Sequence, residues 1–79
     1  MKKIDYPQDF FVNIESEQNR LGRITINLHA DLFTVEIDIV QKDSRKIWHH
    51  IDTLYKVDNK DDALQLGVQR LSQFLRGDN

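Results

Sequence analysis

The residues best suited to chemistry lie in one short segment, residues 48–52, which reads W-H-H-I-D. If this segment is a β-strand, its first, third and fifth side chains project from one face. An arginine and a histidine of an earlier alternating segment are expected on the same face of the sheet. A large aromatic side chain beside hydrogen-bonding groups is typical of protein interfaces. The predicted partner-binding site therefore consists of Arg23, His29, Trp48, His50 and Asp52.

The two adjacent histidines raise the question of a metal site. Neighbouring strand residues point to opposite faces, so His49 and His50 are poorly placed to bind one ion. His50 and Asp52 could share an ion, with His29 as a third ligand if the strands are neighbours. The spacing nevertheless matches no recurrent zinc motif. We expect neither a metal site nor another cofactor.

Catalytic patterns are missing from the sequence. The three glycines are dispersed along the chain, so no Gly-rich phosphate-binding loop is present. Ser44 lies in a charged loop and Ser72 on a helix flank, and neither is expected to have a histidine and an acid nearby. Glu36 and Asp38 share a strand face, where carboxylates are usually only solvated. The sequence therefore predicts a protein that is not an enzyme.

Length and composition indicate which broad class of protein this is. The chain has 79 residues, a net charge of −2 and no cysteine. A chain of this length buries only about 60–65% of its unfolded surface, so a partner or a second copy that covers apolar surface would stabilise it. No apolar run follows the N-terminal lysines, and no segment has the length of a membrane span. We expect a cytoplasmic protein with no membrane association and no small-molecule cofactor.

One loop offers a second hypothesis. Lys42, Arg45 and Lys46 cluster between two expected strands and could contact nucleic acid. No basic block occurs elsewhere, and the expected first helical turn contains Asp61 and Asp62, which disfavours phosphate binding there. A protein partner or self-association is therefore the first hypothesis, and nucleic-acid binding through the loop 42–46 is the alternative.

The last quarter of the chain has the clearest secondary-structure signal. Asn59 is placed to cap a helix, Asp61 and Asp62 suit the positive end of its dipole, and Gly77 suits its end. Leu66 points away from the apolar side of this helix. The apolar stripe, wide enough to cover a sheet, consists of Leu64, Val68, Leu71 and Leu75, flanked by Ala63, Gly67 and Phe74.

The preceding residues predict a sheet. Residues 23–29 and 33–40 alternate apolar and polar residues and are close enough to form an antiparallel hairpin. Residues 46–55 read as a further strand with blurred alternation, which indicates burial on both faces or a β-bulge. Residues 10–16 favour a strand, but residues 10–21 can also be read as a helix that ends at Gly22.

These elements predict one α+β domain over residues 1–79, with residues 1–9 as a flexible arm. The sheet is mainly antiparallel, with three or four strands, and the C-terminal helix packs on one face. The element order is ββββα, or αβββα if residues 10–21 are helical. We expect a small non-catalytic binding or regulatory module that acts through protein–protein interaction and can form a homodimer.

Overall fold

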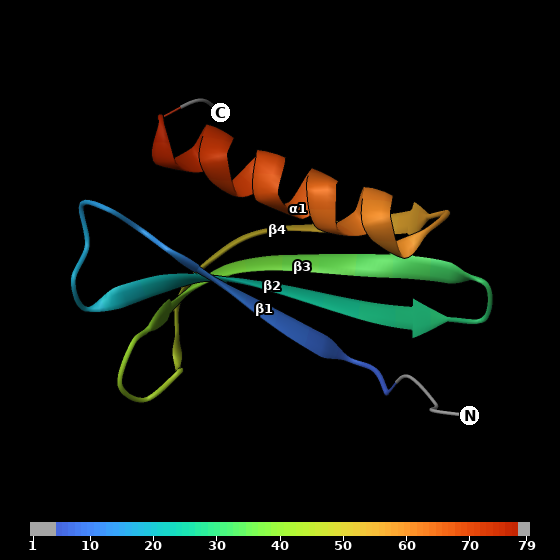
Figure 1. Ribbon diagram of the computed structural model, residues 1–79, viewed down its shortest axis with the longest axis horizontal. Coiled ribbons are helices and arrows are strands. Elements are labelled where there is room, and N and C mark those ends of the chain that lie inside the picture. The colour runs from blue at the N-terminus through green and yellow to red at the C-terminus, as the bar shows by residue number, and fades with distance from the viewer. Residues whose placement is uncertain (1–4, 78–79) are drawn as a thin grey trace.

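The computed structural model describes residues 5–77 and shows one sheet with one helix above it (Figure 1). This α+β arrangement has the order ββββα, so the predicted fold class is confirmed and the helical alternative for residues 10–21 is wrong. Within residues 5–77, no helix is both long and apolar enough to cross a bilayer. The elements are β1 (Gln8–Asn13), β2 (Arg20–His29), β3 (Leu32–Gln41), β4 (Ile47–Val57) and α1 (Lys60–Leu75).

The strands form an antiparallel meander in the order β1-β2-β3-β4. The tight β2–β3 turn, in which Ala30 has a φ of 56°, lies at the end where α1 begins, which we call the turn end. The β1–β2 and β3–β4 loops lie at the opposite end, which we call the loop end (Figure 1). The helix covers one face of the sheet, the helix face, and leaves the other as an open face.

The core lies between the helix and the two central strands. Ile24 and Ile26 of β2 and Val35 and Ile37 of β3 are fully buried beneath α1. This burial follows from the period-2 alternation of the two strands, which places their apolar residues on one face. Ala63 and Leu71 complete the cluster from the helix side, together with Val57 at the end of β4.

The helix is capped as its sequence predicts. The side chain of Asn59 accepts a hydrogen bond from the backbone N–H of Asp62 at 2.8 Å, which satisfies one of the free donors of the first turn. Gly77 has a φ of 81°, the left-handed conformation that closes many helices. These local signals fix both ends of α1.

The buried stripe of α1 is rotated from the expected one. Ala63, Gly67 and Leu71 form its buried line, whereas Val68 and Leu75 are exposed. The small residues allow the helix backbone to approach the sheet closely, and this contact sets which side of the helix is buried. The larger side chains are thereby moved to a flank that faces β1.

The expected N-terminal arm is partly structured. β1 begins at Gln8, so the last two residues of the expected arm belong to the sheet. The ring of Tyr6 packs edge-on against Phe33 with 5.8 Å between centroids, and this contact holds the chain against the core. Met1 to Ile4 lie outside the described residues.

Candidate functional site

Irregular pairing of β4 decides where the predicted site residues lie. The register pairs Val40 with Ile47 but Ile39 with His49, so Trp48 is an extra residue in β4. A second shift makes Ile51 extra, and a third falls near the end of the strand. Each extra residue interrupts the alternation of side chains, so the bulge alternative for this strand is confirmed.

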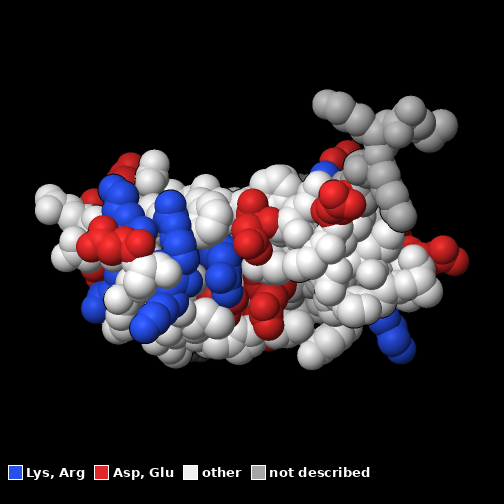
Figure 2. Space-filling model, turned by 90° about the horizontal axis from the view of Figure 1, so that it is seen from below, with Lys and Arg blue, Asp and Glu red and all other residues white. Residues whose placement is uncertain are grey.

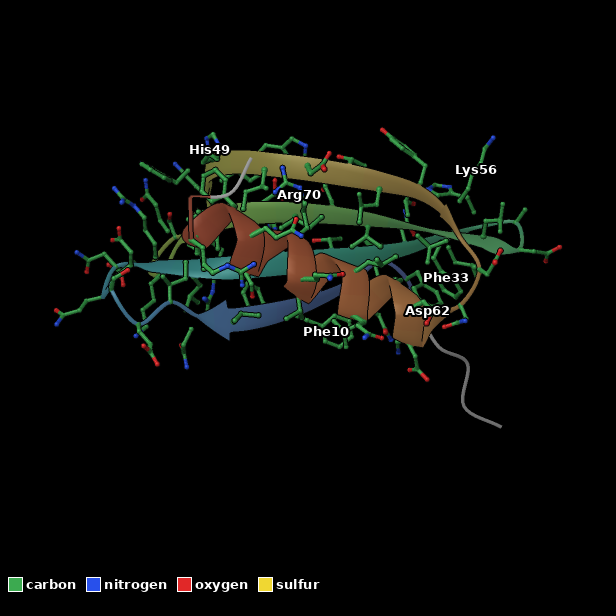
Figure 3. The ribbon with its side chains drawn as sticks, turned by 90° about the horizontal axis from the view of Figure 1, so that it is seen from above. Phe10, Phe33, His49, Lys56, Asp62 and Arg70 are labelled. Atoms are coloured by element: carbon green, nitrogen blue, oxygen red, sulfur yellow. The ribbon has the colours of Figure 1, made fainter. Side chains whose placement is uncertain are left out.

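The bulges divide the predicted site between two faces. His50 pairs with Asp38 and lies on the open face beside Arg23. Asp52 instead lies on the helix face, where its Oδ2 accepts a hydrogen bond from the Nε of Arg70 at 3.2 Å. Figure 3, viewed from the helix side, shows Arg70 reaching from α1 toward β4. The expected common face of His50 and Asp52 is therefore wrong, because the bulge at Ile51 turns the strand between them.

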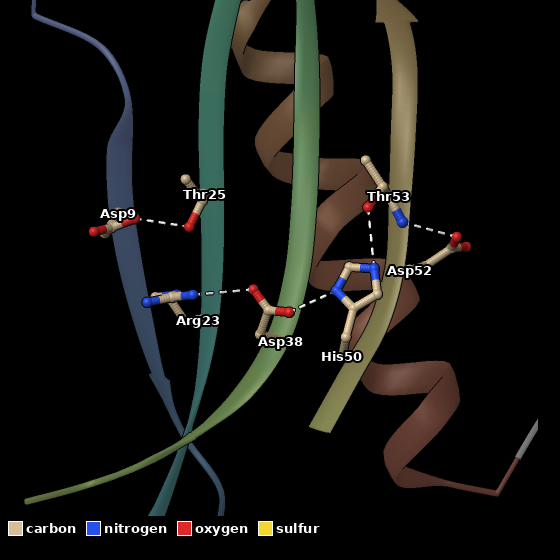
Figure 4. A network of polar contacts seen from close by, with 7 residues as sticks. All are labelled: Asp9, Arg23, Thr25, Asp38, His50, Asp52 and Thr53. Carbon is tan, nitrogen blue, oxygen red and sulfur yellow. Dashed lines mark hydrogen bonds and ion pairs between the residues drawn. The ribbon is translucent and has the colours of Figure 1, made fainter. Parts of the chain in front are cut away.

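A buried carboxylate lies at the centre of the open face. The side chain of Asp38 is 0% exposed although the one helix in the described part of the chain covers the opposite face. Its Oδ2 accepts from the Nη2 of Arg23 at 3.2 Å, and its Oδ1 lies 2.6 Å from the Nδ1 of His50 (Figure 4). The two neighbouring side chains cover Asp38 and compensate its charge. The expectation that Asp38 is simply solvated is wrong.

The contacts of His50 fix its orientation. An ionised carboxylate only accepts, so Nδ1 of His50 carries the proton and donates to Asp38. In the neutral ring, Nε2 then accepts from the hydroxyl of Thr53, which lies 3.1 Å away. The resulting chain of hydroxyl, imidazole and carboxylate has the order found in nucleophilic catalytic triads. The backbone N–H of Thr53, however, donates to Asp52 at 2.8 Å.

Sequence reasoning missed Thr53 for a geometric reason. In a regular strand, residues three apart lie on opposite faces, so His50 and Thr53 would not meet. The bulge at Ile51 places both on the open face. The blurred apolar pattern of this strand was the available signal, but it does not tell which residue is the extra one.

A shallow groove of about 300 Å³ runs across the open face toward the turn end. At its side, the hydroxyl of Thr25 donates to Asp9 at 2.7 Å, and inside it the buried hydroxyl of Thr34 has no described hydrogen-bond partner. The predicted site residue His29 lies in this groove, together with Thr53. The groove is lined by Pro7, Thr25, Asn27, His29, Thr34, Glu36 and Thr53.

Trp48 stands apart from the open-face network. It is 50% exposed at the loop end, and the guanidinium of Arg20 lies 3.8 Å from the centroid of its ring. His49 is on the helix face, where its ring stacks on Phe74 with 5.1 Å between centroids. The aromatic–cation pair of Trp48 and Arg20 is a site feature that sequence reasoning missed, since only the fold brings these residues together.

The basic loop lies at the same end. Figure 2, which views the open face, shows Lys and Arg side chains gathered at the loop end of the molecule. The guanidinium of Arg45 lies 4.6 Å from the ring centroid of Phe11 in β1, so the loop folds back toward the sheet. Lys42 and Lys46 flank Arg45 in the exposed loop.

Within residues 5–77, no three metal-binding side chains are grouped closely enough to hold an ion. Comparisons of the chain with protein-family models, with curated proteins and with solved structures give no match in any of the three. The function is therefore inferred from the chemistry of the open face and the loop end.

Proposed function

We propose that this chain is a small, non-catalytic, cytoplasmic binding module that recognises a protein partner through the open face of its sheet. The observation that supports the proposal is the burial of Asp38 on the face of the sheet opposite to α1. A buried charge is unfavourable unless it is compensated, whereas a threonine or serine at this position would carry no charge to compensate. The network of Asp38, Arg23 and His50 is therefore best explained by what it presents to a partner.

The open face presents a fixed set of hydrogen-bonding groups. His50 is half-exposed and held in one orientation by Asp38 and Thr53, so a partner meets a pre-organised imidazole. Pre-organised groups lose little side-chain entropy on binding, which favours affinity. The neighbouring groove adds hydroxyl, amide and carboxylate groups. At the loop end, Trp48 and Arg20 are of the residue types that dominate binding energy at protein interfaces.

Two features favour binding over catalysis at Thr53. Its backbone N–H is already engaged by Asp52, so it does not serve as a donor to a developing oxyanion. The groove beside it is partly open to solvent, whereas triad chemistry depends on a site that excludes water. The hydroxyl therefore acts as a hydrogen-bond partner that orients His50. The absence of cysteine is consistent with a reducing compartment.

The proposal is tested by affinity purification of the tagged full chain from its native host, with bound protein and nucleic acid both identified. Thr53→Arg places a bulky charged side chain in the groove and is expected to reduce recovery of the specific protein partner at least tenfold. The matched control is Gln65→Arg, which puts the same side chain on the exposed side of α1 and should leave recovery unchanged.

Equal recovery of the partner by Thr53→Arg and by the wild type would overturn the open-face proposal. Recovery of nucleic acid in place of a protein would also overturn it. Trp48→Ala is a third variant in this experiment, since the exposed ring can be removed without opening the core. Loss of the partner in this variant extends the binding surface to the loop end.

A second candidate function is nucleic-acid binding at the loop end. The specific observation in its favour is the position of Arg45 over Phe11, in a loop that also contains Lys42 and Lys46. Positive charge next to an aromatic ring is a common arrangement in single-strand binding.

This candidate predicts a steep dependence on salt. Three phosphate contacts imply that affinity falls about 20- to 40-fold between 50 and 200 mM salt. Fluorescence anisotropy with single- and double-stranded probes measures this directly. Lys46→Glu should weaken binding, whereas Lys60→Glu at the turn end should not. Binding that is undetectable or insensitive to salt removes the candidate.

A further inference from the structure

The flank of α1 that faces β1 is uncovered. Within residues 5–77, the helix packs across β2, β3 and β4, while β1 extends the sheet beyond it. Phe10 lies on the β1 side of α1 (Figure 3). Val68 and Leu75 on this flank are 40% and 44% exposed. They border a groove of about 350 Å³ whose apolar surface comes from Val12, Ile14, Val68, Leu71 and Leu75.

The same side of the molecule carries the open edge of the sheet. β1 pairs only with β2 among the described strands, so its other side presents unpaired backbone groups. The opposite edge, β4, is interrupted by three register shifts and by Lys56 with a φ of 58°. Bulged edges resist pairing with another strand, whereas a regular edge accepts it. The edge that can accept a strand is therefore the one beside the apolar groove.

The charges of the two ends are complementary. The loop end carries Arg20, Lys42, Arg45 and Lys46 against Glu15, Glu17 and Asp43, whereas the turn end carries Asp31, Asp58, Asp61 and Asp62 against Lys56 and Lys60. Basic groups therefore outnumber acidic groups in the first set, and acidic groups outnumber basic groups in the second. The described acidic side chains at the loop end include Glu17, which is already paired with Arg20 at 3.3 Å. Two copies placed side by side with their strands antiparallel would therefore set a basic end beside an acidic end in both directions.

We propose that this groove is occupied by a second copy of the chain, related by a two-fold axis beside β1. The two β1 strands pair antiparallel across the axis, so the groove at the loop end of each copy faces the turn end of the other copy. A two-fold interface of this kind is self-complementary and closes without forming filaments. The pairing leaves both open faces exposed, so it stands independently of the function proposed for that face.

The experiment is sedimentation velocity on the full chain over a concentration range from micromolar to submillimolar. The wild type is expected to shift from monomer to dimer. Val68→Asp is expected to raise the dimer dissociation constant at least tenfold, because it would bury an unpaired charge in the interface. Leu75→Lys is a second variant on the same flank with the same expectation.

Leu66→Asp is the matched control. Leu66 is 41% exposed, almost the same as Val68, but it borders a different groove, on the β4 side of α1. Dimerisation of this variant should equal that of the wild type, and circular dichroism should show that all variants are folded. A wild type that stays monomeric throughout overturns the proposal. So does a dimer that Leu66→Asp disrupts and Val68→Asp leaves intact.

Discussion

Replacement of Asp38 by alanine is expected to lower the free energy of unfolding by about 3 kcal/mol. The carboxylate is fully buried. One of its oxygens contacts Arg23 and the other contacts His50. Its removal leaves the mostly buried guanidinium of Arg23 without its partner, and removal of one member of a buried pair is far more damaging than replacement of both. The expected loss is at the low end of the range known for breaking a buried ion pair, because His50 is half-exposed and can be solvated.

Urea denaturation followed by circular dichroism measures this change. The matched control is Asp9→Ala, which removes another carboxylate from the open face. Asp9 is exposed and accepts one hydrogen bond from Thr25 at 2.7 Å, so the expected loss is below about 1 kcal/mol. Similar losses for the two variants would show that Asp38 is in effect solvated, and the main support for a pre-organised open face would be lost.

Gly67→Val is expected to destabilise the protein by about 2 kcal/mol through steric conflict between α1 and the sheet. A Cβ added at this position would lie 2.7 Å from the Cγ2 of Ile24 and 3.1 Å from the Cγ1 of Val35. Both atoms belong to stiff β-branched side chains in the core, so the helix itself would have to move. Replacing a helical glycine recovers less than about 1 kcal/mol, which is too little to offset the conflict.

Thermal and urea unfolding of Gly67→Val are compared with Gln65→Val, which adds valine to the exposed side of the same helix. The control should change stability by less than about 0.5 kcal/mol. Ile24→Ala in the Gly67→Val background provides a stricter test, because it removes the atom that the new Cβ would meet. The double variant should lose less stability than the sum of the single variants. Strict additivity would mean that the helix already has room at this position.

Structural features that depend on residues close together in the sequence could be predicted. The cap at Asn59, the left-handed Gly77 and the alternation of β2 and β3 depend on residues close together in the chain, and each is confirmed. The choice of a strand over a helix for the segment 10–16 also followed from local propensity, because aromatic and β-branched residues favour extended backbone, but the strand ends at Asn13 and not at residue 16. The buried line of α1 lies one position away from the predicted stripe. The reason is that the close approach of the helix to the sheet at Gly67 depends on the strands that face it.

The site was less predictable because it depends on long-range pairing. Arg23, Asp38 and His50 belong to three different strands, and Trp48 meets Arg20 only through the folded loop end. Three of the five predicted partner-binding residues, Arg23, His29 and His50, lie on the open face. Trp48 and Asp52 are separated from them because the bulges in β4 interrupt the regular alternation of its side chains between the two faces.

The sequence by itself determined the three later strands, the C-terminal helix, their order and the apolar side of each central strand, and it favoured a strand for the first element. These properties follow from periodicity and end signals that each segment carries alone. Only the tertiary structure decided that Asp38 is buried, that Thr53 joins His50, and that no strand of residues 5–77 covers one flank of α1. The physical reason is that a bulge or a register is chosen by the fit between two strands, and neither strand encodes that fit alone.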